Sequence, residues 1–484
     1  MSSPLKDRLE RLANPIVLKE MYQSLHSKKF LAALWLLLLV ALYAYTTIYV
    51  SSAGGECGDD MFFAFTAFTY IMGVCLLPYL GFSTLLQEIR GRTIELVNIT
   101  TLTSNQQVRG RLFASLVRLI LLYTILGPFA VTAFLLRGIG VQTIFFVLYS
   151  VFILSVVACA VGIFFGALTS VKRVGTIARW GYLAVIAASL FSMSMWLQIG
   201  MVGGTLWNVS LDVETLVGMG LLSVLALLAA WLLLAAAANV LTFEADKCWG
   251  QTKFIVLLIV LVACGYPWVV WFSLRRSMSA SSDLLFFAQF TAALLLGLTG
   301  FFWITETGRV SQRWRKRLEG RGTLSRLVAY PWLDGAGSSA IFLLLPAGVM
   351  VGSLMLVNAW ISLDMDVYVP AVTSVTYLLF FGALGRGAVR LLPRRLRAPW
   401  LVRVFTFGFV GLSMMGAILL LSYGVPDDLP AVLSGLSPVL YVNQFAEGGA
   451  DPWVPLVLPL LVGCSYHLGA VFFGLRRLLH EQSI

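Results

Sequence analysis

The sequence predicts an all-α integral membrane protein with about twelve transmembrane helices. Hydrophobic residues make up 59% of the 484 residues and charged residues only 12%, about half the charged share of a typical soluble protein. Apolar runs of roughly the 20 residues that a helix needs to cross a bilayer recur along the whole chain. Because backbone polar groups in lipid must be satisfied within their own segment, these runs are expected to be helices.

Twelve apolar runs are the predicted spans, and they divide evenly between the two halves of the chain. Residues 1–30 form a charged leader, 31–242 hold the first six runs, and 243–484 hold the last six. The runs lie near 31–50, 61–86, 112–136, 141–169, 180–198, 215–241, 254–274, 284–305, 338–358, 367–385, 404–423 and 453–475.

Lysine and arginine place both termini on the cytoplasmic side. With the N-terminus inside, nearly all of these residues fall in inner segments, and the outer loops hold only Arg137, Arg275 and Arg276. This is the positive-inside bias of helical membrane proteins. The net charge of +11 is then explained by inner loops that contact anionic membrane lipids, and no nucleic-acid partner is expected. Only Cys57 of the six cysteines falls in an outer loop, so we expect no extracellular disulfide.

The leader contains a segment that predicts an amphipathic helix on the membrane surface. Residues 14–30 read NPIVLKEMYQSLHSKKF, with Pro15 suited to the first helical position. The apolar residues that share one face at helical spacing are Val17, Leu18, Met21 and Leu25. Polar residues, including Lys19 and Glu20, lie mostly elsewhere around the helix. This distribution predicts a helix in the plane of the headgroups, with an ordinary soluble helical leader as the alternative.

A long polar segment, QEIRGRTIELVNITTLTSNQQVRGR at 87–111, separates the second and third predicted spans. A simple turn between two membrane helices needs only a few residues. Glu88, Arg90 and Glu95 are interspersed with isoleucine and leucine. This mixture predicts a short amphipathic helix over about 88–104 on the cytoplasmic side, and a solvated loop without a partner is the alternative.

The same segment resembles the signature of the type-2 ABC transporter permeases. The resemblance lies in the Thr-Ile-Glu-Leu of 93–96 and the Thr-Thr-Leu-Thr-Ser of 100–104, followed by Gly-Arg at 110–111 in place of the family's Gly-Lys. Two departures occur: Gly91 is displaced by one position from the family's Gly-Thr, and Thr101 replaces its proline. The leader helix is similar to the elbow helix that precedes the first span in that family.

The resemblance implies a function for the segment. In the family it is a coupling helix, which docks on a separate ATPase subunit and passes nucleotide-driven movement to the membrane helices. The chain would then be the permease subunit of an ABC exporter in the bacterial cytoplasmic (inner) membrane. ATP and magnesium would be bound by the partner ATPase, and this chain would need no cofactor. The residues expected to couple to the ATPase here are Glu88, Arg90, Thr93, Glu95, Leu96, Thr100 and Leu102.

A weaker second copy of the motif, RLEGRGTLSRLVAYPWLDG at 317–335, follows the eighth predicted span. It has Ser325 where the family has glutamate, so we expect a degenerate coupling loop. Both copies follow the second span of their half, which favours two six-helix permease units fused in parallel. One permease unit followed by an unrelated six-span region is the alternative, and a second permease chain is a candidate partner. The matching residues are Arg321, Gly322, Thr323, Leu324 and Pro331.

Missing motifs and scarce ionisable groups restrict the function. The sequence has no G-x-x-x-x-G-K-[ST] phosphate loop, so we do not expect the chain to be an enzyme that hydrolyses ATP. No Cys/His cluster suggests a metal site.

Arg118 lies near the inner end of the third span, where its side chain can snorkel. His467 is a candidate for lining a substrate path, with a hydrogen-bonded histidine inside the bundle as the alternative. This scarcity disfavours a secondary, ion-coupled transporter, which is the alternative function together with a scaffold that transports nothing.

Two glycine pairs predict close contacts between helices. Gly162 and Gly166 lie in the fourth predicted span, and Gly348 and Gly352 lie in the ninth. Small residues at this spacing let two helix backbones approach each other in a membrane. We expect both pairs to serve packing.

Overall fold

The computed structural model describes most of the first half of the chain and parts of the second half. All described elements are helices, and the described residues include no strand. The chain divides into two compact units, Met1–Phe243 and Glu244–Ile484. The described residues are 15–26, 28–51, 58–91, 103–136, 139–171, 175–203, 213–242, 249–274, 322–333, 336–358 and 369–391, with scattered positions from 292 to 303 and from 402 to 467.

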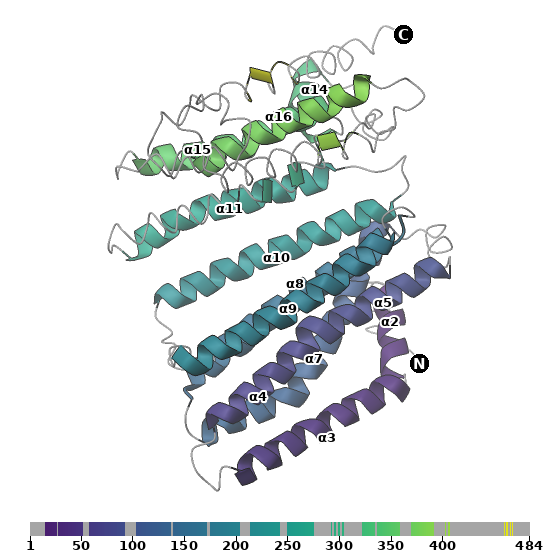
Figure 1. The fold of residues 1–484 in the computed structure, drawn as a ribbon, viewed down its shortest axis with the longest axis vertical. Coiled ribbons are helices and arrows are strands. Elements are labelled where there is room, and N and C mark those ends of the chain that lie inside the picture. Colours follow the sequence, from purple (N-terminus) through teal and green to yellow (C-terminus); the bar gives the residue numbers. More distant parts are fainter. Residues whose placement is uncertain are drawn as a thin grey trace, which may run out of the picture. The chain divides into compact units, whose positions relative to one another are not determined.

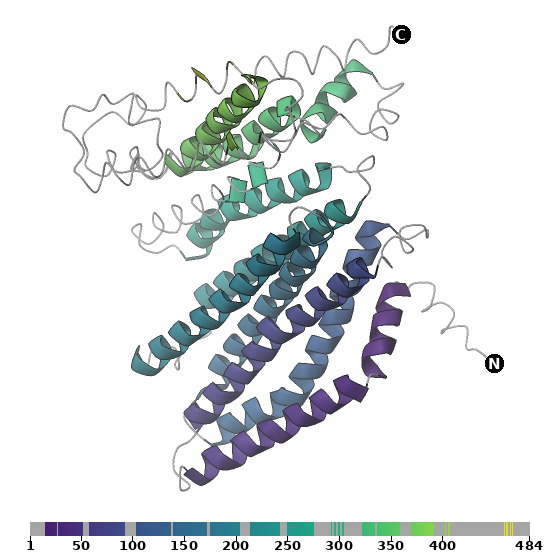
Figure 2. The same ribbon diagram turned by 45° about the vertical axis from the view of Figure 1, so that its right-hand side comes forward.

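In the first unit, long helices follow the short helix α2, Pro15–Leu25 (Figure 1). Each predicted span of this half corresponds to one helical stretch. The stretches are α3, Lys28–Ser51; α4, Gly58–Tyr70, which continues through the π-helix η1, Ile71–Leu76, into α5, Leu77–Arg90; α7, Ser104–Leu135; α8, Val141–Leu168; α9, Gly175–Gly203; and α10, Val213–Leu241. Figures 1 and 2 show α2 set at an angle to α3, and α2 packs mainly against α7.

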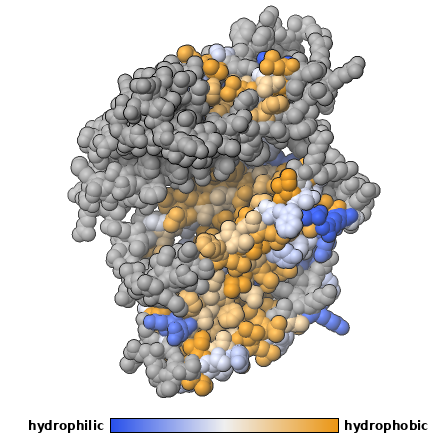
Figure 3. Space-filling model, viewed as in Figure 1, coloured by the Kyte–Doolittle hydropathy of each residue, from blue (hydrophilic) through white to orange (hydrophobic). Residues whose placement is uncertain are grey.

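Five described helical stretches of this unit are long and apolar enough to cross a membrane, namely Gly58–Arg90, Ser104–Leu135, Val141–Leu168, Gly175–Met193 and Gly218–Leu241. Within α3, Leu34–Val50 forms a further apolar helical stretch among the described residues. Figure 3 shows an apolar band across these helices, with hydrophilic residues toward their ends. Large apolar side chains of this unit, such as Trp35, Tyr43 and Leu135, are exposed. An apolar surface of this extent is unusual for a soluble monomer and is suited to contact with lipid.

α8 packs against α5, α7, α9 and α10 and so lies at the centre of the first unit. A Cβ atom added to Gly162 would lie 2.5 Å from the carbonyl oxygen of Pro78 in α5. A Cβ atom added to Gly166 would lie 3.0 Å from the Leu85 side chain, also in α5. The close contact that the first glycine pair predicts is therefore confirmed.

The π-helix η1 changes the hydrogen-bond register of the helix 58–90 just before Pro78. Proline has no N–H to donate, so a register change near it is a common way to accommodate the residue. A Cβ atom on Gly73 in η1 would lie 2.5 Å from the hydroxyl oxygen of Ser155 in α8. The Tyr70 hydroxyl donates to the Ser189 carbonyl oxygen in α9 at 3.1 Å. The irregular segment is thus held between α8 and α9.

In the second unit, α15 packs against α11, α16 and the short 3-10 helix η3. The described helices are α11, Gly250–Leu274; α14, Thr323–Ala329; η3, Tyr330–Trp332; α15, Ala336–Asn358; and α16, Val369–Leu391. They correspond to the predicted spans near 254–274, 338–358 and 367–385, whereas the spans predicted near 284–305, 404–423 and 453–475 fall largely outside the described residues.

The second glycine pair does not make the predicted contact within the described part of the chain. Atoms added at Gly348 and Gly352 in α15 would meet nothing within 4 Å there. Among the described residues, the same spacing gives a close contact in α8 and none in α15.

Candidate functional site

α2 begins at Pro15 as predicted, but its buried face carries a carboxylate. Ile16 and Glu20 lie one turn apart and are both buried, whereas Leu18 is exposed. The expectation that Glu20 belongs to the outer, polar side of this helix is wrong. The reason lies outside α2, because α7 supplies two arginines that the pattern of the leader alone does not reveal.

The helix ends on either side of the predicted coupling segment are well defined. α5 continues to Arg90, and the Gly91 N–H donates to the Gln87 carbonyl oxygen at 2.8 Å. Thr103 caps α7: its hydroxyl accepts from the Gln106 N–H at 3.3 Å, and its own N–H donates to the Gln106 side chain at 3.0 Å. This is a capping box, which defines a helix start. Glu88 and Arg90 therefore belong to the last turn of α5 and not to a separate amphipathic helix.

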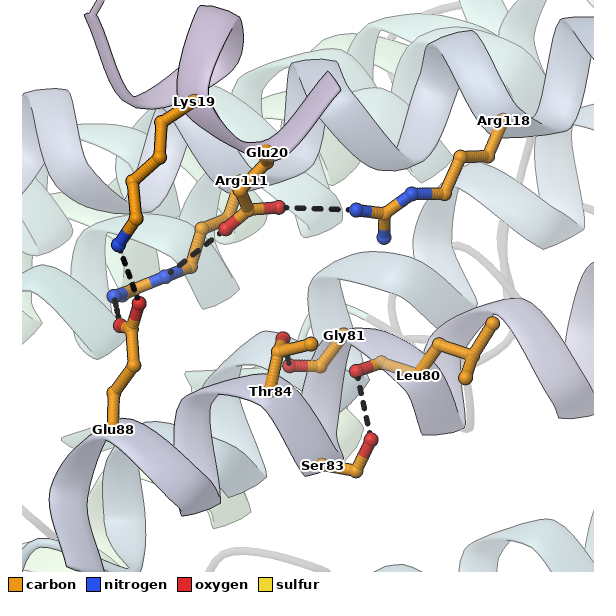
Figure 4. Close-up of polar contacts among 9 residues, drawn as sticks. All are labelled: Lys19, Glu20, Leu80, Gly81, Ser83, Thr84, Glu88, Arg111 and Arg118. Atoms are coloured by element: carbon orange, nitrogen blue, oxygen red, sulfur yellow. Dashed lines mark hydrogen bonds and ion pairs between the residues drawn. The ribbon is translucent and has the colours of Figure 1, made fainter. Parts of the chain in front are cut away.

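Five charged side chains from α2, α5 and α7 form a continuous cluster (Figure 4). We call it the ion cluster; in order of contact it consists of Lys19, Glu88, Arg111, Glu20 and Arg118. The Lys19 ammonium lies 3.2 Å from Glu88 Oε1. The Arg111 guanidinium donates to Glu88 through Nη2, and its Nε lies 3.6 Å from Glu20 Oε1. Arg118 Nη2 lies 3.5 Å from Glu20 Oε2.

The inner members of the ion cluster are shielded from solvent. The side chains of Arg111, Arg118 and Glu20 are 4%, 9% and 10% exposed, whereas those of Glu88 and Lys19 are 24% and 52% exposed. Burial raises the pKa of Glu20 above its ordinary value, and the positive charges of Arg111 and Arg118 oppose this increase. The prediction that the Arg118 side chain snorkels to the surface is wrong, because Glu20 supplies a partner for it inside the bundle.

Hydroxyl groups on α5 near the ion cluster are satisfied by their own helix. The Ser83 hydroxyl donates to the Leu80 carbonyl oxygen and the Thr84 hydroxyl to the Gly81 carbonyl oxygen, each at 3.0 Å (Figure 4). The protons of these two hydroxyl groups are therefore used within α5.

The ion cluster lies where the predicted coupling segment joins the helices. Glu88 stands in the last turn of α5, and Arg111 stands two turns into α7. Arg90 ends α5 and is exposed. The other residues predicted to couple to an ATPase lie outside the described residues, namely Thr93, Glu95, Leu96, Thr100 and Leu102.

The second predicted coupling segment is helical where it is described. Gly322 caps α14, Thr323 and Leu324 begin it, and Pro331 lies in η3. Arg321 lies outside the described residues. The short helix stands directly before α15, and its coupling to an ATPase stays a prediction.

His467 is buried, and its ring nitrogen Nε2 lies 3.3 Å from the Leu379 carbonyl oxygen in α16. This contact agrees with a hydrogen-bonded histidine inside the bundle. A role in lining a path stays a prediction.

The ion cluster could have been anticipated in part from the sequence. Arg111 and Arg118 are seven residues apart, so they share one face of α7. Basic residues that face a helix bundle need acidic partners, but the sequence does not show which of several acids would supply them.

Neither a metal site nor a similar known protein adds to the description of this site. Among the described residues, no group of three or more His, Cys, Asp or Glu side chains could hold a metal ion. No family model, curated protein or solved structure matches the chain.

Proposed function

We propose that the chain is the membrane-spanning permease subunit of an ATP-driven ABC exporter in the bacterial cytoplasmic membrane. Separate ATPase subunits would couple to it through the segment 88–104 and would carry the ATP and magnesium. Both termini would lie in the cytoplasm. The observation that carries this proposal is the position of the ion cluster, which joins the two ends of that segment to each other and to α2.

The mechanical argument concerns rigidity. A segment that transmits movement must be attached firmly at both ends, because a loose attachment would absorb the displacement. Glu88 on α5 and Arg111 on α7 are paired directly, and Glu20 on α2 adds a third attachment. Ion pairs that are shielded from water are stronger than exposed pairs. A push on the segment would therefore move α2, α5 and α7 together.

Movement of α5 would reach the centre of the unit. Gly162 and Gly166 of α8 lie against Pro78 and Leu85 of α5 with almost no free space. Close-packed helices transmit displacement because they cannot compress. In this proposal the second half contributes a second permease unit, whose own degenerate coupling segment lies near 317–335.

The test is reconstitution with the partner ATPase. The tagged chain is purified from its native membrane in mild detergent, and the co-purifying protein with a phosphate loop is expressed and added back. We expect the chain to stimulate ATP hydrolysis, and Glu95→Arg to reduce this stimulation by about tenfold, since charge fixes the register of a docking surface. Asp60→Arg, an equal charge reversal in the exposed first turn of α4, is the matched control and should leave the stimulation unchanged.

Three results would contradict the proposal. Equal stimulation by wild type and Glu95→Arg would remove the coupling role of the segment. Transport driven by a proton gradient without any ATPase would favour a secondary transporter. Binding of an ATPase without any effect on its hydrolysis or on transport would favour a membrane scaffold.

A further inference from the structure

A lysine in the first turn of α11 is completely buried. Lys253 is 0% exposed. Its ammonium donates to the carbonyl oxygen of Pro331 at 3.0 Å and to that of Leu333 at 2.7 Å. It also lies 5.6 Å from the ring centroid of Phe342 in α15, a distance at which an aromatic face attracts a cation.

Burying an ammonium is unfavourable unless hydrogen bonds replace its water. Here the replacement comes from main-chain carbonyls at the end of η3, where a helix carries partial negative charge and exposes unpaired acceptors. The Ser338 hydroxyl donates to the same Leu333 carbonyl oxygen at 2.7 Å. The end of the segment is thus held from α11 on one side and from the first turns of α15 on the other.

The segment held in this way has one buried side and one exposed side. Tyr330 and Leu333 are buried, whereas Val328 is 72% exposed and Leu327 is also exposed. At its start, the Ser325 hydroxyl donates to the Gly322 carbonyl oxygen at 2.8 Å. The segment is a built element with hydrogen bonds at both ends.

A comparison of the two units shows a shared arrangement with different chemistry. In the first unit, Lys19 precedes the first span and pairs with Glu88 at the end of the second span. In the second unit, Lys253 begins the first span and binds the segment that follows the second predicted span. Main-chain carbonyls do not depend on residue type, so this lysine can hold a segment that has Ser325 in place of the family's glutamate.

We propose that Lys253 is a positioning residue that fixes the segment 322–333 in the conformation through which it engages the ATPase subunit. The inference rests on the proposed function for its ATPase partner. The second segment is then a working contact, and the expected degeneracy of its sequence is offset by the lysine.

Hydrogen exchange in the full-length chain measures directly how strongly Lys253 stabilises the segment 322–333. In Lys253→Met we expect the amides of 323–333 to exchange about tenfold faster, because local opening of the segment then requires less free energy. Exchange in α7 should not change. Thr252→Val is the matched control: Thr252 is buried next to Lys253, but its hydroxyl donates within its own helix, to the Trp249 carbonyl oxygen. This variant should leave the segment unchanged.

Ser338→Ala provides a second variant if Lys253→Met does not fold. It removes a donor to the Leu333 carbonyl oxygen with a small change in volume, and it should loosen 330–333 in the same direction. Unchanged exchange in either folded variant would overturn the proposal.

The ATPase readout separates positioning from mere stability. With the ATPase identified for the proposed function, Lys253→Met should lower the maximal stimulation of ATP hydrolysis about threefold or more, while Thr252→Val should not. Faster exchange with full stimulation would overturn the coupling role of the segment. If the wild-type chain stimulates no ATPase, the proposed function itself fails, and hydrogen exchange still decides whether Lys253 holds the segment.

Discussion

Arg111 is the residue on which the ion cluster depends, because its guanidinium lies between the carboxylates of Glu88 and Glu20. Within the ion cluster, removing it would leave Glu88 with Lys19 alone and Glu20 with Arg118 alone, and breaking a buried pair costs about 3 kcal/mol. We therefore expect Arg111→Met to lower the thermal unfolding midpoint in detergent clearly. Arg109→Met, an exposed arginine on the same helix, should change stability by only about 0.5 kcal/mol.

The matching double change tests whether charge is the cause. Adding Glu88→Gln to Arg111→Met removes one of the two carboxylates and leaves Glu20 paired with Arg118, so it should restore part of the lost stability. No recovery would mean that the arginine contributes by packing its stem and not by its charge.

Glu20 gives the fold a defined dependence on pH. Burial raises its pKa in the folded chain, so the folded state binds the proton more tightly than the unfolded state does. The stability contributed by this group is present below the unfolded pKa and is lost as pH rises through the folded pKa. The unfolding midpoint of the wild type should therefore fall relative to that of Glu20→Gln as pH rises from the ordinary carboxyl range. A relative increase would show that Arg111 and Arg118 outweigh burial.

At the scale of the helix, the sequence predicts what is local and misses what depends on neighbours. The helices of the first half are predicted correctly because each apolar run is recognisable without reference to any other, and five of the described stretches are long and apolar enough to cross a membrane. The extension of α5 to Arg90 was missed because polar residues near a membrane surface can continue a helix as readily as end it. Likewise, the burial of Glu20 and Arg118 depends on a pairing between α2 and α7, which are far apart in the chain.

The contact between α5 and α8 allows a graded test at the level of one helix pair. Gly162→Ala would bring a methyl group to 2.5 Å from a backbone oxygen that cannot move alone, and overpacking of this kind costs about 1–3 kcal/mol. Gly166→Ala meets a flexible leucine side chain at 3.0 Å and should cost less. Gly220→Ala in α10 meets nothing within 4 Å in the described part of the chain and should stabilise by up to about 1 kcal/mol.

The order of the three unfolding midpoints, measured in one detergent, is the result that matters here. Equal midpoints would mean that α5 and α8 can separate freely, and the route by which α5 would move the centre of the unit would be lost.

For the whole molecule, the proposed function depends on which side of the membrane the two predicted coupling segments, 88–104 and 317–335, face. ATP is cytoplasmic, so a coupling segment must face the cytoplasm. From the distribution of lysine and arginine we expect 88–104 and 317–335 to lie there. The same expectation assigns Cys57 to the outside and Cys248 to the inside. Among the described residues, Cys75, Cys159 and Cys264 are buried and should react slowly.

The natural cysteines therefore test the orientation without any new label site. A maleimide that cannot cross the cytoplasmic membrane should modify the wild type and Cys248→Ser in intact cells, but not Cys57→Ser. After the membrane is permeabilised, Cys57→Ser should become reactive through Cys248. Modification of Cys248 from outside the intact cell would show that the topology is the reverse of the expected one. With six spans per half, the loop that carries Cys248 and the segment 88–104 lie on the same side of the membrane. Both inner segments would then face a compartment without ATP, and no ATPase could act on them.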